Sequence, residues 1–113
     1  MAKNVDLSHN ALDLMILKCA SLGLVHGYGV ARWIQAVTDD LLSVEEGTLY
    51  PALHRLEERG FIEAEWGISE NNRRAKYYRL TVLGRRQLRT AASSWGDLAT
   101  AMGKVLGATQ EPV

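Results

Sequence analysis

The residues of this chain that are best suited to chemistry are its bases, which are gathered in one short stretch. The 113-residue chain has 13 Lys and Arg residues and 13 Asp and Glu residues, so its formal net charge is zero. Residues 73–89, RRAKYYRLTVLGRRQLR, nevertheless contain no acid and seven of the bases: Arg73, Arg74, Lys76, Arg79, Arg85, Arg86 and Arg89. Local positive charge, and not the total, governs counterion release at phosphates. The segregation therefore predicts that this stretch binds a polyanion.

Other kinds of chemistry find few suitable residues. The histidines His9, His26 and His54 fall on separate predicted elements, with no serine or cysteine placed to act as a nucleophile beside them. The single cysteine, Cys19, lies in an apolar run, where a buried thiol is favoured over a metal ligand. We therefore expect no enzymatic activity, no metal and no cofactor.

Composition and length indicate one folded domain. The hydrophobic fraction of 47% and the charged fraction of 23% are ordinary for a globular protein. We see no secretory signal and no apolar stretch of membrane-spanning length, so we expect a cytoplasmic protein without a membrane partner.

Three helices are predicted in the first half of the chain. Asn10 or Ser8 can cap the first helix, which is apolar on nearly every side and ends at Gly23. The second helix opens at 27–29, and the third begins between residues 45 and 48 and ends at residue 60, because Pro51 fits only a first turn. A domain of this size rarely encloses an all-apolar helix, so we expect a second subunit to cover part of the first one.

A hairpin and a long helix are predicted in the second half. Residues 61–68 and 76–80 favour strands joined by the turn 69–72, and Thr81 caps a helix that runs to about residue 106. The fold class is mainly α (α+β), a winged helix-turn-helix with a long C-terminal helix. We assign residues 1–80 to the winged domain, 81–107 to a dimerisation helix and 108–113 to a frayed tail.

The third helix has one face for the core and one for a ligand. On a helical wheel Leu49, Leu53 and Leu56 lie together, whereas Gly47, Pro51 and His54 point away from them. Taken alone, this pattern also fits an ordinary surface helix. Beside a preceding helix and a basic hairpin, it predicts DNA binding, in which Thr48, Tyr50 and His54 reach the major groove and Arg73, Arg74 and Lys76 hold the flanking backbone or minor groove.

Three strings carry a resemblance to a known family. Residues 47–62, GTLYPALHRLEERGFI, and 73–84, RRAKYYRLTVLG, preceded by HGYG at 26–29, closely resemble the PadR family of bacterial transcriptional regulators. The resemblance implies a homodimeric winged-helix repressor that releases a promoter when a small molecule binds, and DNA contacts at the six residues named above. Because one helix follows the hairpin, the chain is similar to the short subfamily. Glu45 and Glu46 depart from expectation as acids near the phosphate path, although they can cap the helix.

The last helix carries a seam pattern that predicts a partner helix. Its apolar residues follow spacings of three and four: Leu88, Ala91, Trp95, Leu98, Met102 and Val105. The same stripe could instead pack on its own domain, but we favour a two-fold dimer with two DNA half-sites about one helical turn apart.

Trp95 lies at the middle of this seam and has two interpretations. In multidrug-responsive members of the resembling family, an aromatic residue here stacks on flat ligands between the subunits, which implies a planar or aromatic effector. Met15, Leu98 and Met102 could line such a site. Alternatively, Trp95 only anchors the interface. The alternative function for the chain as a whole is a winged-helix protein-interaction module that binds no operator.

Overall fold

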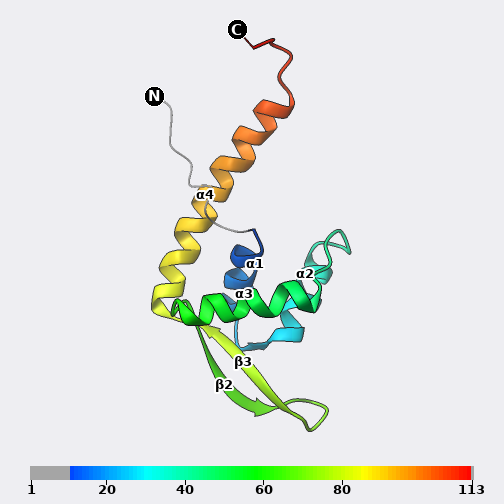
Figure 1. The fold of residues 1–113 in the computed structure, drawn as a ribbon, viewed down its shortest axis with the longest axis vertical. Helices are drawn as coiled ribbons and strands as arrows, with labels where there is room; N and C mark the ends of the chain where they lie inside the picture. Colours follow the sequence, from blue (N-terminus) through cyan, green and yellow to red (C-terminus); the bar gives the residue numbers. More distant parts are fainter. Residues whose placement is uncertain (1–10, 113) are drawn as a thin grey trace.

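The computed structural model describes residues 11–112 and has the architecture expected from the sequence (Figure 1). Four helices and three strands follow one another within this range: α1 (Ala11–Ser21), β1 (Val25–His26), α2 (Gly27–Val37), α3 (Glu46–Glu58), β2 (Ile62–Ile68), β3 (Arg74–Leu80) and α4 (Val82–Leu106). The expected α+β class, with a helix-turn-helix, a hairpin wing and a long last helix, is confirmed. Ser8, His9 and Asn10 lie outside the described residues, so the predicted cap of the first helix stays a prediction.

The sheet is antiparallel with the strand order β1-β3-β2. β2 and β3 form the wing, in a continuous register from Ile62 opposite Leu80 to Ile68 opposite Arg74. β1 pairs with the root of β3, and its two residues are too few to show a pattern in the sequence. The predicted start of the second wing strand was wrong, because this strand begins at Arg74. Lys76 therefore lies two residues inside the strand and not at the tip.

The core is built around α1, which packs against α2, α3, α4 and β3. Its buried residues are Leu12, Ile16, Leu17, Cys19 and Ala20. The wheel of the third helix is confirmed, since Leu49, Leu53 and Leu56 are at most 2% exposed. Cys19 is packed as a small apolar side chain, as expected, and burial raises the pKa of its thiol to about 11.

The two ends of α3 are fixed by backbone hydrogen bonds. At its start, the Glu45 carbonyl accepts from the N–H groups of Thr48 and Leu49, but the Glu45 side chain makes no capping hydrogen bond. The expected acidic side-chain cap was therefore wrong at Glu45. At the other end Gly60 adopts a φ of 77°, and its N–H donates to the carbonyl of Glu57 at 3.0 Å. This left-handed residue stops the helix and turns the chain into β2.

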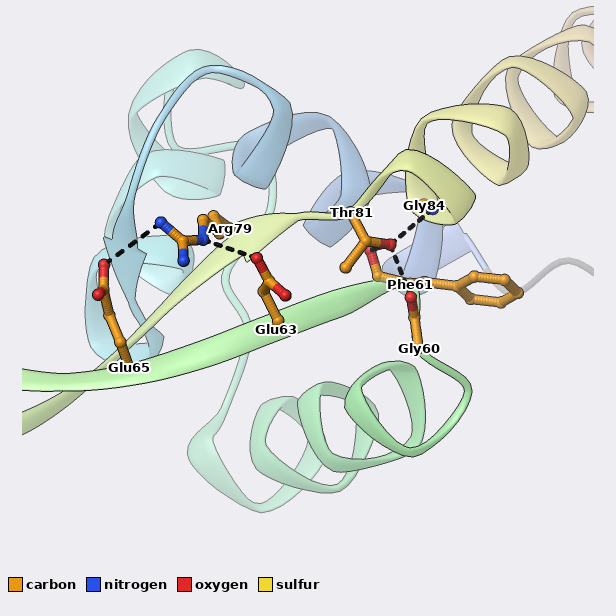
Figure 2. Close-up of polar contacts among 7 residues, drawn as sticks. All are labelled: Gly60, Phe61, Glu63, Glu65, Arg79, Thr81 and Gly84. Carbon is orange, nitrogen blue, oxygen red and sulfur yellow. Dashed lines mark hydrogen bonds and ion pairs between the residues drawn. The ribbon is translucent and has the colours of Figure 1, made fainter.

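The start of α4 is held to the root of the wing (Figure 2). The Thr81 hydroxyl accepts the N–H of Gly84 at 2.9 Å and donates to the carbonyl of Gly60 at 2.6 Å, which confirms Thr81 as the cap. Gly84 packs so closely on the backbone carbonyl of Phe61 that a β-carbon would overlap it. From this joint α4 runs along α1 and then beyond the body of the domain, and the residues from 99 to 106 are exposed (Figure 1).

Candidate nucleic-acid interface

The outer face of α3 carries the three side chains predicted to read DNA. Thr48 and Tyr50 are exposed on opposite flanks of the first turns, and His54 is exposed on the ridge between them. His54 Nε2 lies 3.1 Å from a carboxylate oxygen of Glu58, one turn further along the helix. This face is open along its length and is free for a ligand.

The wing has two unlike faces, because successive residues of a strand point to opposite sides. Arg74 and Lys76 share one face with Trp66. Because Lys76 contacts Glu57 of α3, this face of the wing lies on the side of α3. Arg79 lies on the other face, which we call the back of the wing. There its guanidinium Nε donates to Glu63 at 2.8 Å, and Nη1 lies 3.8 Å from Glu65 (Figure 2).

The acids on the back of the wing determine which bases of the wing keep a free positive charge. The hydrogen bond to Glu63 raises the pKa of Arg79, and two carboxylates offset its single positive charge. Arg73, at the turn, and Arg74 have no ion pair with any residue from 11 to 112. The free positive charge of the wing therefore lies at its tip and on the side of α3.

A groove of about 260 Å³ joins that side of the wing to the helices. It brings together three of the predicted residues, Tyr50, Arg74 and Lys76, and is completed by His26, Gly27, Tyr28, Ala75 and Tyr78. Thr48 lies outside it and borders a separate hollow on the far flank of α3. One continuous surface thus links α2, α3 and β3.

The groove is kept in shape by close packing at the start of α2. A β-carbon at Gly27 would sit 2.8 Å from Cε1 of Tyr50, so the tyrosine ring lies directly on the backbone there. His26 Nδ1 accepts the N–H of Gly29 at 3.0 Å and caps α2. The HGYG string therefore gives α2 a capped start and makes room for the aromatic ring of α3.

The two bases in the groove are held differently. The Arg74 guanidinium lies 4.5 Å from the centre of the Trp66 ring, a cation–π arrangement that leaves its N–H donors free. The Lys76 ammonium instead donates to Glu57 of α3 at 2.8 Å, in a pair whose side chains are 32% and 31% exposed. This hydrogen bond raises the pKa of Lys76. Lys76 is thus already partnered, and Arg74 is not.

Sequence reasoning missed two residues of this surface, Tyr28 and Trp66. Tyr28 lines the groove and is exposed, with the Arg32 guanidinium 5.8 Å from its ring centre, and Trp66 supports Arg74. For Tyr28, the available signal was an aromatic residue between two glycines at the predicted start of a helix. Nothing in the local pattern distinguished Trp66 from a residue of the core.

A second concave surface lies on another side of the molecule. It is an apolar cleft of about 330 Å³ between α1, α2 and α4, lined by Leu14, Met15, Lys18, Trp33, Ile34, Val37, Thr38, Leu88, Ala92 and Trp95. Two residues of the predicted effector site, Met15 and Trp95, meet here, but Leu98 and Met102 do not line the cleft. Trp33 of α2 contributes a second indole to the cleft.

The predicted seam on α4 divides into two parts. Ala91 is only 2% exposed and Leu88 packs against the core of its own chain, so both are covered within the single subunit. Further along, Trp95, Met102 and Val105 are 46%, 46% and 68% exposed. Only this outer part, from Trp95 onward, presents open apolar surface.

The described residues offer little for two other kinds of site. From 11 to 112, no three His, Cys, Asp or Glu side chains are grouped so that they could hold a metal ion. None of the helices in this range is both long and apolar enough to cross a bilayer.

Comparisons with known proteins identify the family. The sequence model of the transcriptional regulator PadR-like family matches residues 16–90. An uncharacterized protein of Lysinibacillus sphaericus is 31% identical over 93 residues, which are 82% of this chain and 85% of that protein. A transcriptional regulator of Clostridium thermocellum is similar in structure, with a TM-score of 0.74, 33% identity and coverage of 81% of this chain and 89% of its own. A PadR-like regulator of Bacillus cereus gives a TM-score of 0.71 at 30% identity, covering 86% and 92% of the two chains. The chain therefore belongs to the PadR-like family, a family of transcriptional regulators and not of enzymes.

Proposed function

We propose that this regulator binds a palindromic operator in duplex DNA as a homodimer, represses transcription, and releases the DNA when a small planar or aromatic molecule binds. The observation that carries the proposal is the groove that joins Tyr50 of α3 to Arg74 and Lys76 of the wing. The free bases of the wing are on the same side as this groove, and the one base behind it is neutralised by acids. A regulator of transcription acts at the chromosome, so we place it in the cytoplasm.

In the proposed complex, α3 and the wing contact different parts of the duplex. α3 enters the major groove with Thr48, Tyr50 and His54 toward base edges and phosphates. The wing meets the flanking backbone or minor groove through Arg73 and Arg74, which fix position and do not themselves read sequence. Lys76 lies on the same face of the wing but is already paired with Glu57.

The homodimer is supported by apolar surface that one subunit leaves open. Met102 and Val105 lie on the part of α4 that extends beyond the domain, whereas Trp95 borders the cleft and the less exposed Leu98 lies between them. A two-fold partner would cover this surface and place two α3 helices on one side of the duplex, with half-sites about one helical turn apart. Sedimentation velocity tests this: the wild type should sediment as a dimer, and Met102→Asp should shift it toward the monomer. A monomeric wild type contradicts the proposal.

The ligand response is supported by the apolar cleft between α1, α2 and α4. Trp33 and Trp95 give it two flat aromatic walls, and Met15 gives it an adaptable one. Planar cations and phenolic acids, titrated separately, should quench tryptophan fluorescence in the wild type and much less in Trp95→Leu. Equal quenching in both proteins would leave Trp95 as an interface anchor only.

DNA binding is tested by fluorescence anisotropy with the region upstream of the protein's own gene. We expect tight binding at low salt, and Tyr50→Ala should weaken specific binding far more than binding to random duplex. An equal loss on both would make Tyr50 a phosphate contact. No binding by the wild type at low ionic strength would instead favour a protein-interaction module.

A further inference from the structure

Lys76 holds an unusual position among the bases of the wing, because its charge is used inside the protein. Its ammonium donates to a carboxylate oxygen of Glu57 at 2.8 Å, and the Tyr78 ring centre lies 5.6 Å away. Both partners of the pair are about two-thirds covered. An ion pair of zero net charge releases no counterions on approach to DNA, so Lys76 is poorly placed to act like Arg73 or Arg74.

Glu57 has no evident role other than this pair. It lies in the last turn of α3, where the carbonyl end of the helix dipole disfavours an acid. The neighbouring Glu58 is 66% exposed and lies beside His54 on the open face, so it is not needed for the wing. Glu57 is therefore a carboxylate at the unfavourable end of a helix, and its ion pair is with a base of the wing.

The pair is also the outermost polar link between the wing and the helices. Closer to the root, β3 is tied to the body by its pairing with β1 at Tyr77 and Tyr78. Beyond Lys76, no hydrogen bond or ion pair joins the described residues of the wing to a helix. Arg73 and Arg74 lie three and two residues further out, a distance of about 10 Å for three residues of strand. The angle set at Lys76 therefore determines where these arginines reach relative to α3.

We infer that the Glu57–Lys76 ion pair sets the position of the wing relative to α3, and that Lys76 supports DNA binding through Glu57 and not by neutralising a phosphate. This inference rests on the proposed DNA-binding function. Glu57 and Lys76 are positioning residues in this arrangement, and Arg73 and Arg74 supply the charge.

The test is a double-mutant cycle on the full-length protein, read by operator affinity and by its salt dependence. Glu57→Gln and Lys76→Gln should each weaken binding by about three- to tenfold, and the double variant should be no weaker than either one. The charge-reversed protein E57K/K76E should recover affinity to within about twofold of the wild type, because it restores a pair. The slope of log affinity against log salt should stay at the wild-type value in Lys76→Gln, which loses no phosphate contact, and in the two double variants, which keep the net charge of the pair at zero. In Glu57→Gln the freed ammonium should leave the slope unchanged or make it steeper.

Controls separate this role from a direct contact and from general damage. Glu58→Gln removes the same charge one residue away and should combine additively with Lys76→Gln. Arg74→Gln is the positive control, because it should flatten the slope of log affinity against log salt as the loss of a phosphate contact does. If Lys76→Gln flattens the slope as Arg74→Gln does, or if E57K/K76E binds as weakly as K76E alone, then Lys76 touches DNA and the inference is overturned.

A measurement without DNA keeps the inference testable if the proposed function fails. Amide hydrogen exchange at residues 74–77 should be faster in Glu57→Gln and in Lys76→Gln than in the wild type, and normal in Glu58→Gln. Unchanged exchange in the first two variants would overturn the positioning role. Absence of binding by the wild type, with faster exchange in the variants, would overturn only the DNA-binding proposal.

Discussion

The two faces of the wing predict that two arginines five residues apart on one strand differ in their effect on DNA binding. Arg74 lies on the side of α3 without an ion pair among residues 11–112, whereas Arg79 lies on the back with Glu63 and Glu65. Substituting either one with Gln removes one formal positive charge. Only Arg74→Gln should remove a phosphate contact.

The expected size follows from counterion release. Each phosphate contact contributes about −0.9 to the slope of log affinity against log salt, so a dimer that loses Arg74 from both subunits should lose about 1.8 from its slope. When salt rises from about 50 to about 200 mM, the wild type should thus lose about 12 times more affinity than Arg74→Gln does. Arg79→Gln should keep the wild-type slope.

Fluorescence anisotropy on a labelled operator, measured at four or more salt concentrations for the three proteins, gives these slopes directly. Arg73→Gln serves as a second positive case, since its base lies at the turn. Equal flattening by Arg74→Gln and Arg79→Gln would refute the reasoning, because it would mean that the acids behind the wing do not withdraw Arg79 from the DNA.

Three further predictions concern the scaffold. Gly84→Ala should destabilise the fold by about 1–3 kcal/mol or more, because the new methyl group would meet the Phe61 carbonyl. Gly103→Ala, where a β-carbon would have open space around it, should instead stabilise α4 by up to about 1 kcal/mol. Urea unfolding of both variants measures the two effects. Thr81→Ala should lower the free energy of unfolding by about 1–2 kcal/mol, and Thr81→Ser should lower it much less, since serine keeps the hydroxyl that caps α4. Equal losses in the two variants would show that the methyl group of Thr81 matters and not its hydroxyl. Burial raises the pKa of the Cys19 thiol from 9.0 to about 11, so its contribution to stability is complete below pH 9 and is lost as pH rises toward 11. Over this range the free energy of unfolding should therefore fall less in Cys19→Ala than in the wild type. If it falls equally in both proteins, the raised pKa of Cys19 is contradicted.

The elements of the fold were predictable where a local signal and a burial pattern agreed. The wheel of α3 placed Leu49 and Leu53 in the core, Thr81 capped α4, and Gly60 ended α3, because each of these depends on neighbours within one turn. β1 was not predictable, since a two-residue strand exists only through its pairing with β3.

The candidate site was predictable in its residue types and less so in their roles. The basic stretch 73–89 indicated where the positive charge lies, but not that Glu63 and Glu65 hold Arg79 or that Glu57 holds Lys76. These partners lie 14 to 19 positions away from their bases and meet them only when the hairpin closes and docks on α3. The same limit applies to the stripe on α4, where the sequence could not tell that Ala91 faces its own chain and Val105 faces outward.

The acids behind the wing also affect how copies of the protein search a chromosome. Attraction to unrelated sequence grows with the number of phosphates that a surface can neutralise, and pairing with Glu63 and Glu65 removes Arg79 from that number. Collisions in which the back of the wing meets random duplex should therefore end quickly. Under the proposed function, fewer molecules would then be sequestered along the genome, and more of them would be available for the operator.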